Sequence, residues 1–157
     1  MNITLKNVRT YEGLSEETVA FVASVYVDGK KVGDAKNNGQ GGANDVDVFS
    51  KDGRWDRDLK NKMESEARKH TWTYENQTHQ YDLDSYIGKL VDDFQEQRYL
   101  KRLCRTQTLL RIPNQTYKAG EYTAIKLKYN QNVKARAIKT WGNKVEILNE
   151  SFKKESK

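Results

Sequence analysis

The run TVAFVASVYV (residues 18–27) is followed directly by Asp28-Gly29 and then by KKVGDAK (residues 30–36). β-branched and aromatic residues dominate the first run, and its apolar residues alternate with smaller or more polar ones, which predicts a strand with one buried face. Because glycine accepts a positive φ without a steric penalty, an Asp-Gly pair between two such runs predicts a tight hairpin. We therefore expect an antiparallel sheet built on this hairpin.

The segments on either side of the hairpin predict one further strand and two loops. Ile3, Leu5 and Val8 indicate a short strand near the N-terminus, and residues 11–15 indicate a polar loop. After the hairpin, NNGQGGAND (residues 37–45) contains three glycines and three asparagines, a composition that fits neither a regular strand nor a helix.

Two helices are expected in the middle of the chain. Apolar residues repeat every four positions over residues 55–69, which predicts the first helix. A carboxylate at Asp82 or Asp84 is suited to cap the second, which is expected to extend to about Leu103. The polar and aromatic residues 70–80 between them are expected to form a loop.

The last third predicts two strands, a short helix capped by Asn130 or Asn132 and ended by Gly142, another strand and a frayed tail. These elements are expected at residues 106–112, 122–129, 130–141, 144–149 and 151–157.

The order of these elements predicts an α+β fold. Its antiparallel sheet is expected to combine the N-terminal hairpin with the C-terminal strands, beside two central helices and one short C-terminal helix. With 157 residues the chain is expected to be a single domain. Its parts are a hairpin and Gly-rich loop (1–49), a helical segment (50–103), a basic β/α segment (104–150) and the tail (151–157).

Composition narrows the class of protein. Three Trp, nine Tyr and four Phe argue against disorder, although only 36 % of the residues are hydrophobic. No run approaches the ~18 apolar residues of a membrane helix, and MNITLKNVRT (residues 1–10) lacks the apolar core of a signal peptide. Because Cys104 is the only cysteine, no internal disulfide is possible. We expect a cytoplasmic protein without a membrane partner.

The formal net charge of +6 is unevenly distributed along the chain. Residues 1–97 carry 13 Lys/Arg and 18 Asp/Glu, a net charge of −5, whereas residues 98–157 carry 15 and 4, a net charge of +11. Such asymmetry indicates a surface that faces a polyanion. The alternative is that the two halves attract each other and the excess charge only keeps the protein soluble.

The predicted polyanion-binding residues lie in the basic part of the chain. Four of them follow the spacing i, i+3, i+4 and i+7, which places them on one helical face if the second helix extends that far. Two more are expected on one face of a strand, and two on the last helix. Such cations can contact phosphates, with neighbouring tyrosines available for base stacking, although a solvated face is the usual role of a charge run. These residues are Arg98, Lys101, Arg102, Arg105, Lys126, Lys128, Lys134 and Arg136.

The Gly-rich loop is a second candidate contact. Closely spaced glycines let backbone amides point toward a phosphate, but the loop matches neither GxxxxGK[ST] nor GxGxxG. Positive-φ turn geometry explains the glycines equally well. The candidate ligand-contacting residues are Asn38, Gly39, Gly41, Gly42 and Asn44.

Residues suited to catalysis or metal binding are sparse, and we expect neither a catalytic residue nor a metal or other cofactor. Acidic residues follow the loop at Asp45 and Asp47, and further along up to Asp58, but their spacing does not fit a calcium loop. His70 and His79 are the only histidines and have no third ligand at a matching spacing. A metal-dependent nuclease or phosphodiesterase that uses Asp45, Asp47 and one histidine remains an alternative.

Three segments carry a family resemblance: SEETVAFVASVYVDGKKVGDAKNNGQGG (15–42), YKAGEYTAIKLKYN (117–130) and WGNKVEILNE (141–150). They resemble a family of small, largely uncharacterised proteins of phages and mobile elements, which share a DG hairpin, an N-x-G-x-GG loop and a closing W/Y-G-x-x-V-x-I-L-N strand. This chain has Asn38 where the family would have aspartate, and Ala43 where cysteine is common. The resemblance implies a phage-type accessory protein acting inside bacteria and transfers no catalytic residue.

These observations together predict a binding protein without enzymatic activity. Its expected partner is nucleic acid or a bacterial nucleoprotein complex, and a host-defence inhibitor of the anti-CRISPR kind is one form of this function. The alternatives are the metal-dependent nuclease and a sponge for an anionic nucleotide messenger. Because the pockets of such sponges often lie between subunits, the second alternative would fit a homo-oligomer.

Overall fold

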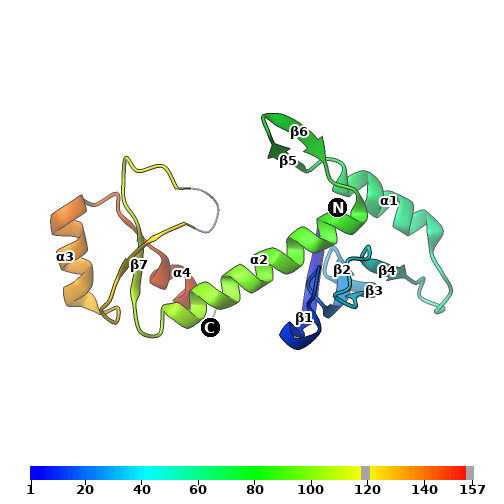
Figure 1. Cartoon of the computed structure of the whole chain (residues 1–157), viewed down its shortest axis with the longest axis horizontal. Helices are drawn as coiled ribbons and strands as arrows, with labels where there is room; N and C mark the ends of the chain where they lie inside the picture. Colours follow the sequence, from blue (N-terminus) through cyan, green and yellow to red (C-terminus); the bar gives the residue numbers. More distant parts are fainter. Residues whose placement is uncertain (118–120, 155–157) are drawn as a thin grey trace. The chain divides into compact units, whose positions relative to one another are not determined.

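The structure is a computed structural model that describes residues 1–117 and 121–154. It divides into two compact units, unit 1 (Met1–Phe94) and unit 2 (Gln95–Lys157). Helix α2 (Leu83–Leu103) begins in unit 1 and ends in unit 2 (Figure 1). A division into compact units does not test independent folding, so the single domain stays a prediction.

Unit 1 is built on a four-stranded antiparallel sheet in the order β1-β2-β3-β4. The strands are β1 (Ile3–Thr10), β2 (Phe21–Val27), β3 (Lys30–Asn37) and β4 (Asp45–Val48). Asp28 and Gly29 both have positive φ values, 48° and 80°, as the tight turn between β2 and β3 requires. The predicted hairpin is thereby confirmed.

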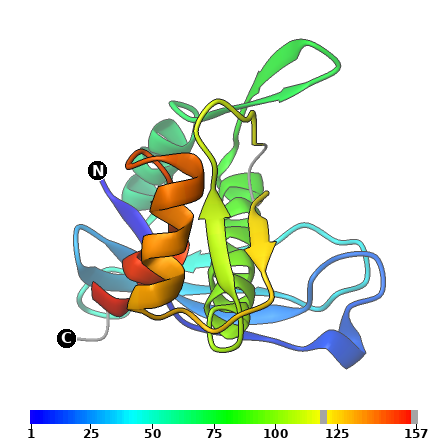
Figure 2. The same ribbon diagram turned by 90° about the vertical axis from the view of Figure 1, so that its left-hand side faces the viewer.

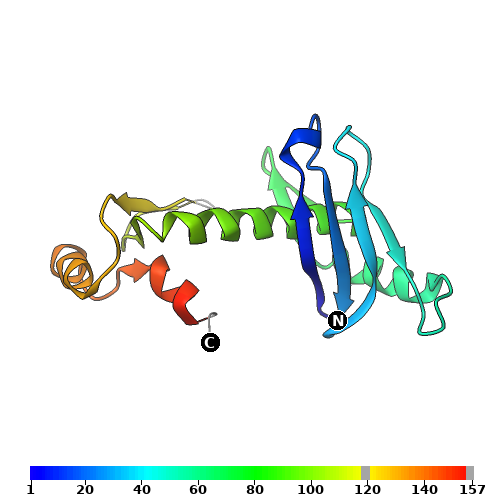
Figure 3. The same cartoon turned by 90° about the horizontal axis from the view of Figure 1, so that it is seen from below.

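The core of unit 1 lies between one face of this sheet and two helices (Figure 3). Phe21 and Val25 of β2 are fully buried there, as their alternation predicted. They belong to the same cluster as Met63 of α1 (Arg57–Ala67) and Ile87 of α2. Both central helices therefore exist as predicted, with α1 two residues shorter at each end than the expected 55–69.

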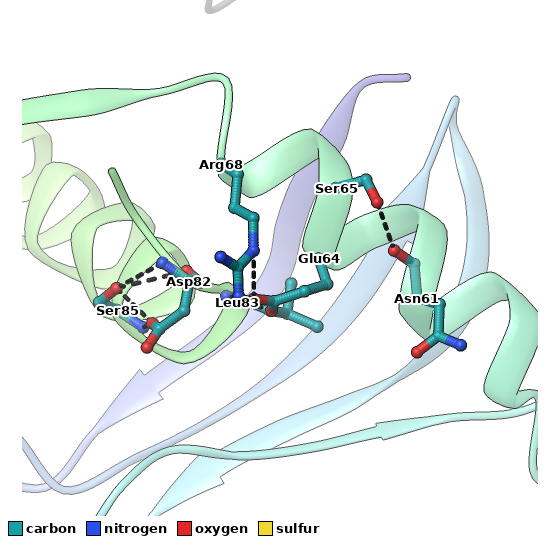
Figure 4. A network of polar contacts seen from close by, with 7 residues as sticks. All are labelled: Asn61, Glu64, Ser65, Arg68, Asp82, Leu83 and Ser85. Carbon is teal, nitrogen blue, oxygen red and sulfur yellow. Dashed lines mark hydrogen bonds and ion pairs between the residues drawn. The ribbon is translucent and has the colours of Figure 1, made fainter. Parts of the chain in front are cut away.

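Polar contacts join the end of α1 to the start of α2 (Figure 4). Asp82 accepts a hydrogen bond from Ser85 N at 2.8 Å, and Ser85 Oγ accepts one from Asp82 N at 3.2 Å, so the two residues cap α2 reciprocally. Glu64 of α1 accepts a further bond from Leu83 N at 2.8 Å and pairs with Arg68. The predicted aspartate cap is confirmed at Asp82.

The prediction of a loop over residues 70–80 is wrong. This segment forms an antiparallel hairpin of β5 (Thr71–Tyr74) and β6 (Gln77–Gln80). Glu75 and Asn76, with φ values of 47° and 63°, make its two-residue turn. Nearly all of its side chains are exposed, so the strands lack the alternation of apolar and polar residues that identifies a half-buried strand.

Unit 2 contains a three-stranded antiparallel sheet in the order β8-β7-β9 and two helices (Figure 2). The elements are β7 (Thr108–Arg111), β8 (Thr123–Ile125), α3 (Gln131–Trp141), β9 (Glu146–Ile147) and α4 (Leu148–Lys154). Of the two asparagines predicted as caps, Asn130 and Asn132, the first caps α3 by accepting a hydrogen bond from Val133 N at 3.0 Å, and Gly142 ends the helix as predicted, with a φ of 83°.

The side chain of Asn149 fastens α4 to β7 and to the chain that precedes it. It is 4 % exposed, and its Oδ1 accepts a hydrogen bond from Leu109 N at 2.9 Å. Its Nδ2 donates to the carbonyls of Cys104 at 3.2 Å and Gln107 at 2.8 Å. Asn149 thus satisfies three backbone groups that would otherwise lack a partner in the protein interior.

The α+β class with antiparallel sheets is confirmed. The N-terminal and C-terminal strands, however, lie in separate sheets, because the C-terminal strands bury their apolar side chains against α3 and α4 instead of joining β1–β4. The described part of the expected tail is helical: α4 begins at Leu148 and ends at Lys154, while residues 155–157 lie outside the described part of the chain. No helix of the described residues is long and apolar enough to cross a membrane.

Candidate nucleic-acid interface

The end of α2 carries four exposed cations, which we call the basic face of α2: Arg98, Lys101, Arg102 and Arg105. The first three lie within the helix, and the turn continues past it because Arg105 N donates to Arg102 O at 3.2 Å. The predicted spacing therefore places Arg98, Lys101 and Arg102 on one face of α2, whereas Arg105 follows in the turn after the helix ends. Leu100, on another side of the same helix, is buried in the core of unit 2.

No member of the basic face of α2 forms an ion pair with any residue in 1–117 or 121–154. Arg102 instead lies over the ring of Tyr99, with its guanidinium carbon 5.5 Å from the ring centroid. Cations in the last turn of a helix are also favoured by the helix dipole, so part of their role is structural. Their uncompensated charge still leaves them available to an anionic partner.

The charge asymmetry follows the division into units. Unit 1 contains 13 Lys/Arg and 17 Asp/Glu, a net charge of −4, whereas unit 2 contains 15 and 5, a net charge of +10. The change of sign predicted at residue 97 falls three residues from the boundary between the units. The positive charge therefore belongs to one compact part of the protein.

Lys126 and Lys128 do not share a strand face, so this prediction is wrong. β8 ends at Ile125, and the chain then bends, with Leu127 N donating to Ile125 O at 2.7 Å. Thr108 Oγ1 fixes the bend by donating to Leu127 O at 2.9 Å. Both lysines are exposed there, and neither forms an ion pair with a described residue.

The two predicted cations of α3 differ in their surroundings. Lys134 Nζ lies 2.7 Å from the Glu150 carboxylate, to which the Tyr129 hydroxyl also donates. Burial and this hydrogen bond raise the pKa of Tyr129 to about 12. Lys134 is thus partly neutralised within unit 2, whereas Arg136 is exposed and forms no ion pair with the described residues.

The Gly-rich loop uses its polar groups in contacts within unit 1. Asn37 Nδ2 donates to Gly42 O at 2.9 Å and to Asn44 Oδ1 at 3.0 Å, and Asn44 in turn donates to Asp84 at the start of α2. The carbonyl of Gly39 accepts the N–H groups of residues 16–18 at 2.9–3.3 Å. These three amides would form an anion-binding nest, but a carbonyl of the chain itself occupies it.

A close backbone contact explains Gly39, and a positive φ explains both Gly39 and Gly41. A Cβ at Gly39 would lie 2.0 Å from the carbonyl oxygen of Leu14, and one at Gly41 would lie 2.1 Å from the Glu17 carboxylate. Both residues also have positive φ values, 88° and 81°. Asn38 is exposed and contacts only Gln40 among the described residues. The loop geometry thus accounts for these glycines without a ligand, and its ligand-contacting role stays a prediction.

The acidic residues and histidines of the nuclease alternative are not brought together. Asp45 and Asp47 lie on β4, and Lys36 Nζ is 3.7 Å from the Asp45 carboxylate. His70 stacks on Tyr86, with ring centroids 4.5 Å apart, and His79 packs against a tryptophan. Within the described residues, no three His, Cys, Asp or Glu side chains are grouped so that they could hold a metal ion.

Cys104 is half-buried beside the core that contains Leu109 and Leu148, and burial raises the pKa of its thiol. Because the thiolate is the reactive form, we expect native Cys104 to be alkylated by iodoacetamide at pH 8 at least severalfold more slowly than in urea. Mass spectrometry over time measures both rates. Equal alkylation rates in the two conditions would contradict the half-buried position of the Cys104 thiol.

Arg111, a cation that the sequence did not single out, lines a cavity in unit 2 together with Lys144, one of the basic residues of the last third of the chain. The signal in the sequence is the pair Pro113-Asn114, which forms a tight turn directly after a strand that ends in arginine. Arg111 does not belong to a run of charges, which is why periodicity does not reveal it.

Comparisons with known proteins identify no relative: no family model, no curated protein and no solved structure matches this chain.

Proposed function

We propose that this chain is a non-enzymatic protein that binds nucleic acid, alone or within a bacterial nucleoprotein complex, through the basic face of α2. The observation that carries the proposal is the set of four exposed cations without an acidic partner among the described residues, in a unit with a net charge of +10. Guanidinium and ammonium groups at this spacing contact phosphates whatever the base sequence. We therefore expect affinity with little sequence specificity.

The resemblance to phage-type accessory proteins supports a bacterial cytosolic setting for this binding. A host-defence inhibitor, such as an anti-CRISPR, is one form of it, in which the basic face of α2 engages the nucleic acid of a host nuclease complex. The positive sign of unit 2 argues against a mimic of DNA, which would be acidic.

The test is a titration of labelled single- and double-stranded 20-mer DNA, followed by fluorescence anisotropy at several salt concentrations. We expect log K to fall linearly with log [salt]. In a variant with all four residues of the basic face of α2 replaced by glutamine, the slope should decrease by about 3, with about a 100-fold loss of affinity at low salt.

A matched control removes the same charge from unit 1, where four exposed cations also lack ion pairs with the described residues. The control variant is Lys30→Gln/Lys51→Gln/Arg57→Gln/Lys62→Gln, and it should keep nearly the wild-type slope. Equal losses in both variants would mean that net charge alone matters. Absence of wild-type binding at low salt would refute the proposal.

A further inference from the structure

A cavity of about 540 Å³ lies in unit 2, beside the end of β7, the loop that follows it and the segment that leads into β9. Its volume falls within the ~300–1,000 Å³ typical of small-molecule sites. Arg111 and Lys144 supply positive charge to its lining, and Glu146 supplies the only carboxylate among the lining residues that the structure describes.

Arg111 is the unusual residue of this cavity. Its Nε is buried and forms no hydrogen bond with any described residue. Its Nη1 lies 3.7 Å from Glu146 Oε2, which is an ion-pair distance but too long for a hydrogen bond. Because the Arg111 side chain is 39 % exposed although its Nε is buried, the N–H groups at the end of the guanidinium are the donors that an anionic ligand in the cavity can reach.

Lys144 adds a second cation to the same lining. It is exposed and forms no ion pair with a residue of the described ranges. Together with Arg111 it exceeds the single negative charge of Glu146, so the cavity favours an anion. The net charge of +10 on unit 2 also favours the binding of an anion.

The loop that lines the cavity together with these cations is held in place by hydrogen bonds. Pro113 and Asn114 occupy the centre of a β-turn, with Asn114 at a φ of 66° and Gln115 N donating to Ile112 O at 3.3 Å. The Tyr117 hydroxyl accepts from Ile112 N at 3.1 Å and donates to Gln115 Oε1 at 2.7 Å. A wall fixed before binding lowers the entropy lost when a ligand is ordered.

We propose that this cavity binds a terminal phosphate group, with the Arg111 guanidinium as its anchor and Lys144 as the second cation. A guanidinium presents planar N–H donors that match two phosphate oxygens, and the end of this one has, among the described residues, only the 3.7 Å ion pair with Glu146. The inference does not rest on the basic face of α2, because the two sites share no residue. The phosphate belongs to a small ester such as a mononucleotide or to the 5′ end of a nucleic acid.

Isothermal titration with inorganic phosphate, adenosine 5′-monophosphate and a 5′-phosphorylated dT hexanucleotide tests the proposal. We expect saturable binding of at least one probe, with a shift of the Arg111 Nε–H signal in the ¹H–¹⁵N spectrum. Tighter binding of the mononucleotide indicates a small-molecule site, and tighter binding of the phosphorylated hexanucleotide than of its 5′-hydroxyl form indicates a nucleic-acid end.

Arg111→Gln should weaken phosphate binding about tenfold or more, and Arg111→Lys should also weaken it because the charge remains but the planar fork is lost. Lys144→Gln changes an exposed side chain that the fold does not need, and a severalfold loss is expected. Arg105→Gln is the control: it should weaken oligonucleotide binding while inorganic phosphate and the mononucleotide bind as to the wild type.

Failure of this site and failure of the nucleic-acid interface give different results. If no probe binds saturably at ~10 mM, or if Arg111→Gln and Lys144→Gln bind as the wild type does, the phosphate site is refuted whatever the 20-mer titration shows. If the 20-mer does not bind but phosphate does, only the nucleic-acid interface on the basic face of α2 is refuted, and the phosphate site stands.

Discussion

Gly39→Ala is expected to destabilise unit 1 by about 3 kcal/mol or more. An added Cβ would lie 2.0 Å from the carbonyl oxygen of Leu14, and the φ of 88° is unfavourable for any residue with a side chain. Relief of the clash would displace the Gly39 carbonyl, which accepts three N–H groups from residues 16–18. Urea unfolding followed by circular dichroism measures the loss.

Gly42→Ala is the matched control in the same loop. No atom lies within 4 Å of the position of its Cβ, and its φ is not positive, so stability should change by less than about 0.5 kcal/mol. The pair of variants distinguishes a structural role of the loop glycines from a role in ligand binding. Equal stability of Gly39→Ala and Gly42→Ala would contradict the structural explanation of the loop glycines and return attention to a bound ligand.

Asn149→Ala is expected to destabilise unit 2 by about 3 kcal/mol. The substitution removes three hydrogen bonds at once and leaves Leu109 N and the carbonyls of Cys104 and Gln107 without their partner. Because Asn149 is 4 % exposed, water does not readily replace these bonds. Amide hydrogen exchange, followed by mass spectrometry, should show faster exchange in β7 and α4.

Asn143→Ala provides the comparison for this variant. Asn143 is exposed in the segment between α3 and β9, and its side chain forms no hydrogen bond with a described residue, so its loss should be nearly neutral. If Asn149→Ala were as stable as Asn143→Ala, the connection between α4 and β7 would not depend on this side chain.

Local sequence signals predicted much of the fold correctly. The Asp28-Gly29 turn, the Asp82 cap and the Asn130 cap each depend on residues within about four positions, so their physical causes can be read from the sequence. The hairpin at residues 71–80 was missed because its exposed strands bury no apolar face and leave no periodic pattern.

The candidate interface was predictable to the extent that it is helical. The basic face of α2 follows from a spacing along one helix, and the structure places all four of its residues in exposed positions. The neutralisation of Lys134 depends on Glu150, sixteen positions away, and the pairing of Arg111 with Glu146 spans two strands. Contacts of this kind are set by packing, which periodicity does not describe.

The sequence by itself determined the hairpin, the two central helices, the α+β class and the change of charge near residue 97, because each depends on neighbouring residues or on simple counting. The tertiary structure alone decided that the strands form separate sheets and that the Gly-rich loop closes on its own amides. It also decided which cations remain without an ion-pair partner among the described residues. Those outcomes depend on which distant groups meet in three dimensions, where burial and hydrogen bonding decide whether a charge is compensated or left to a ligand.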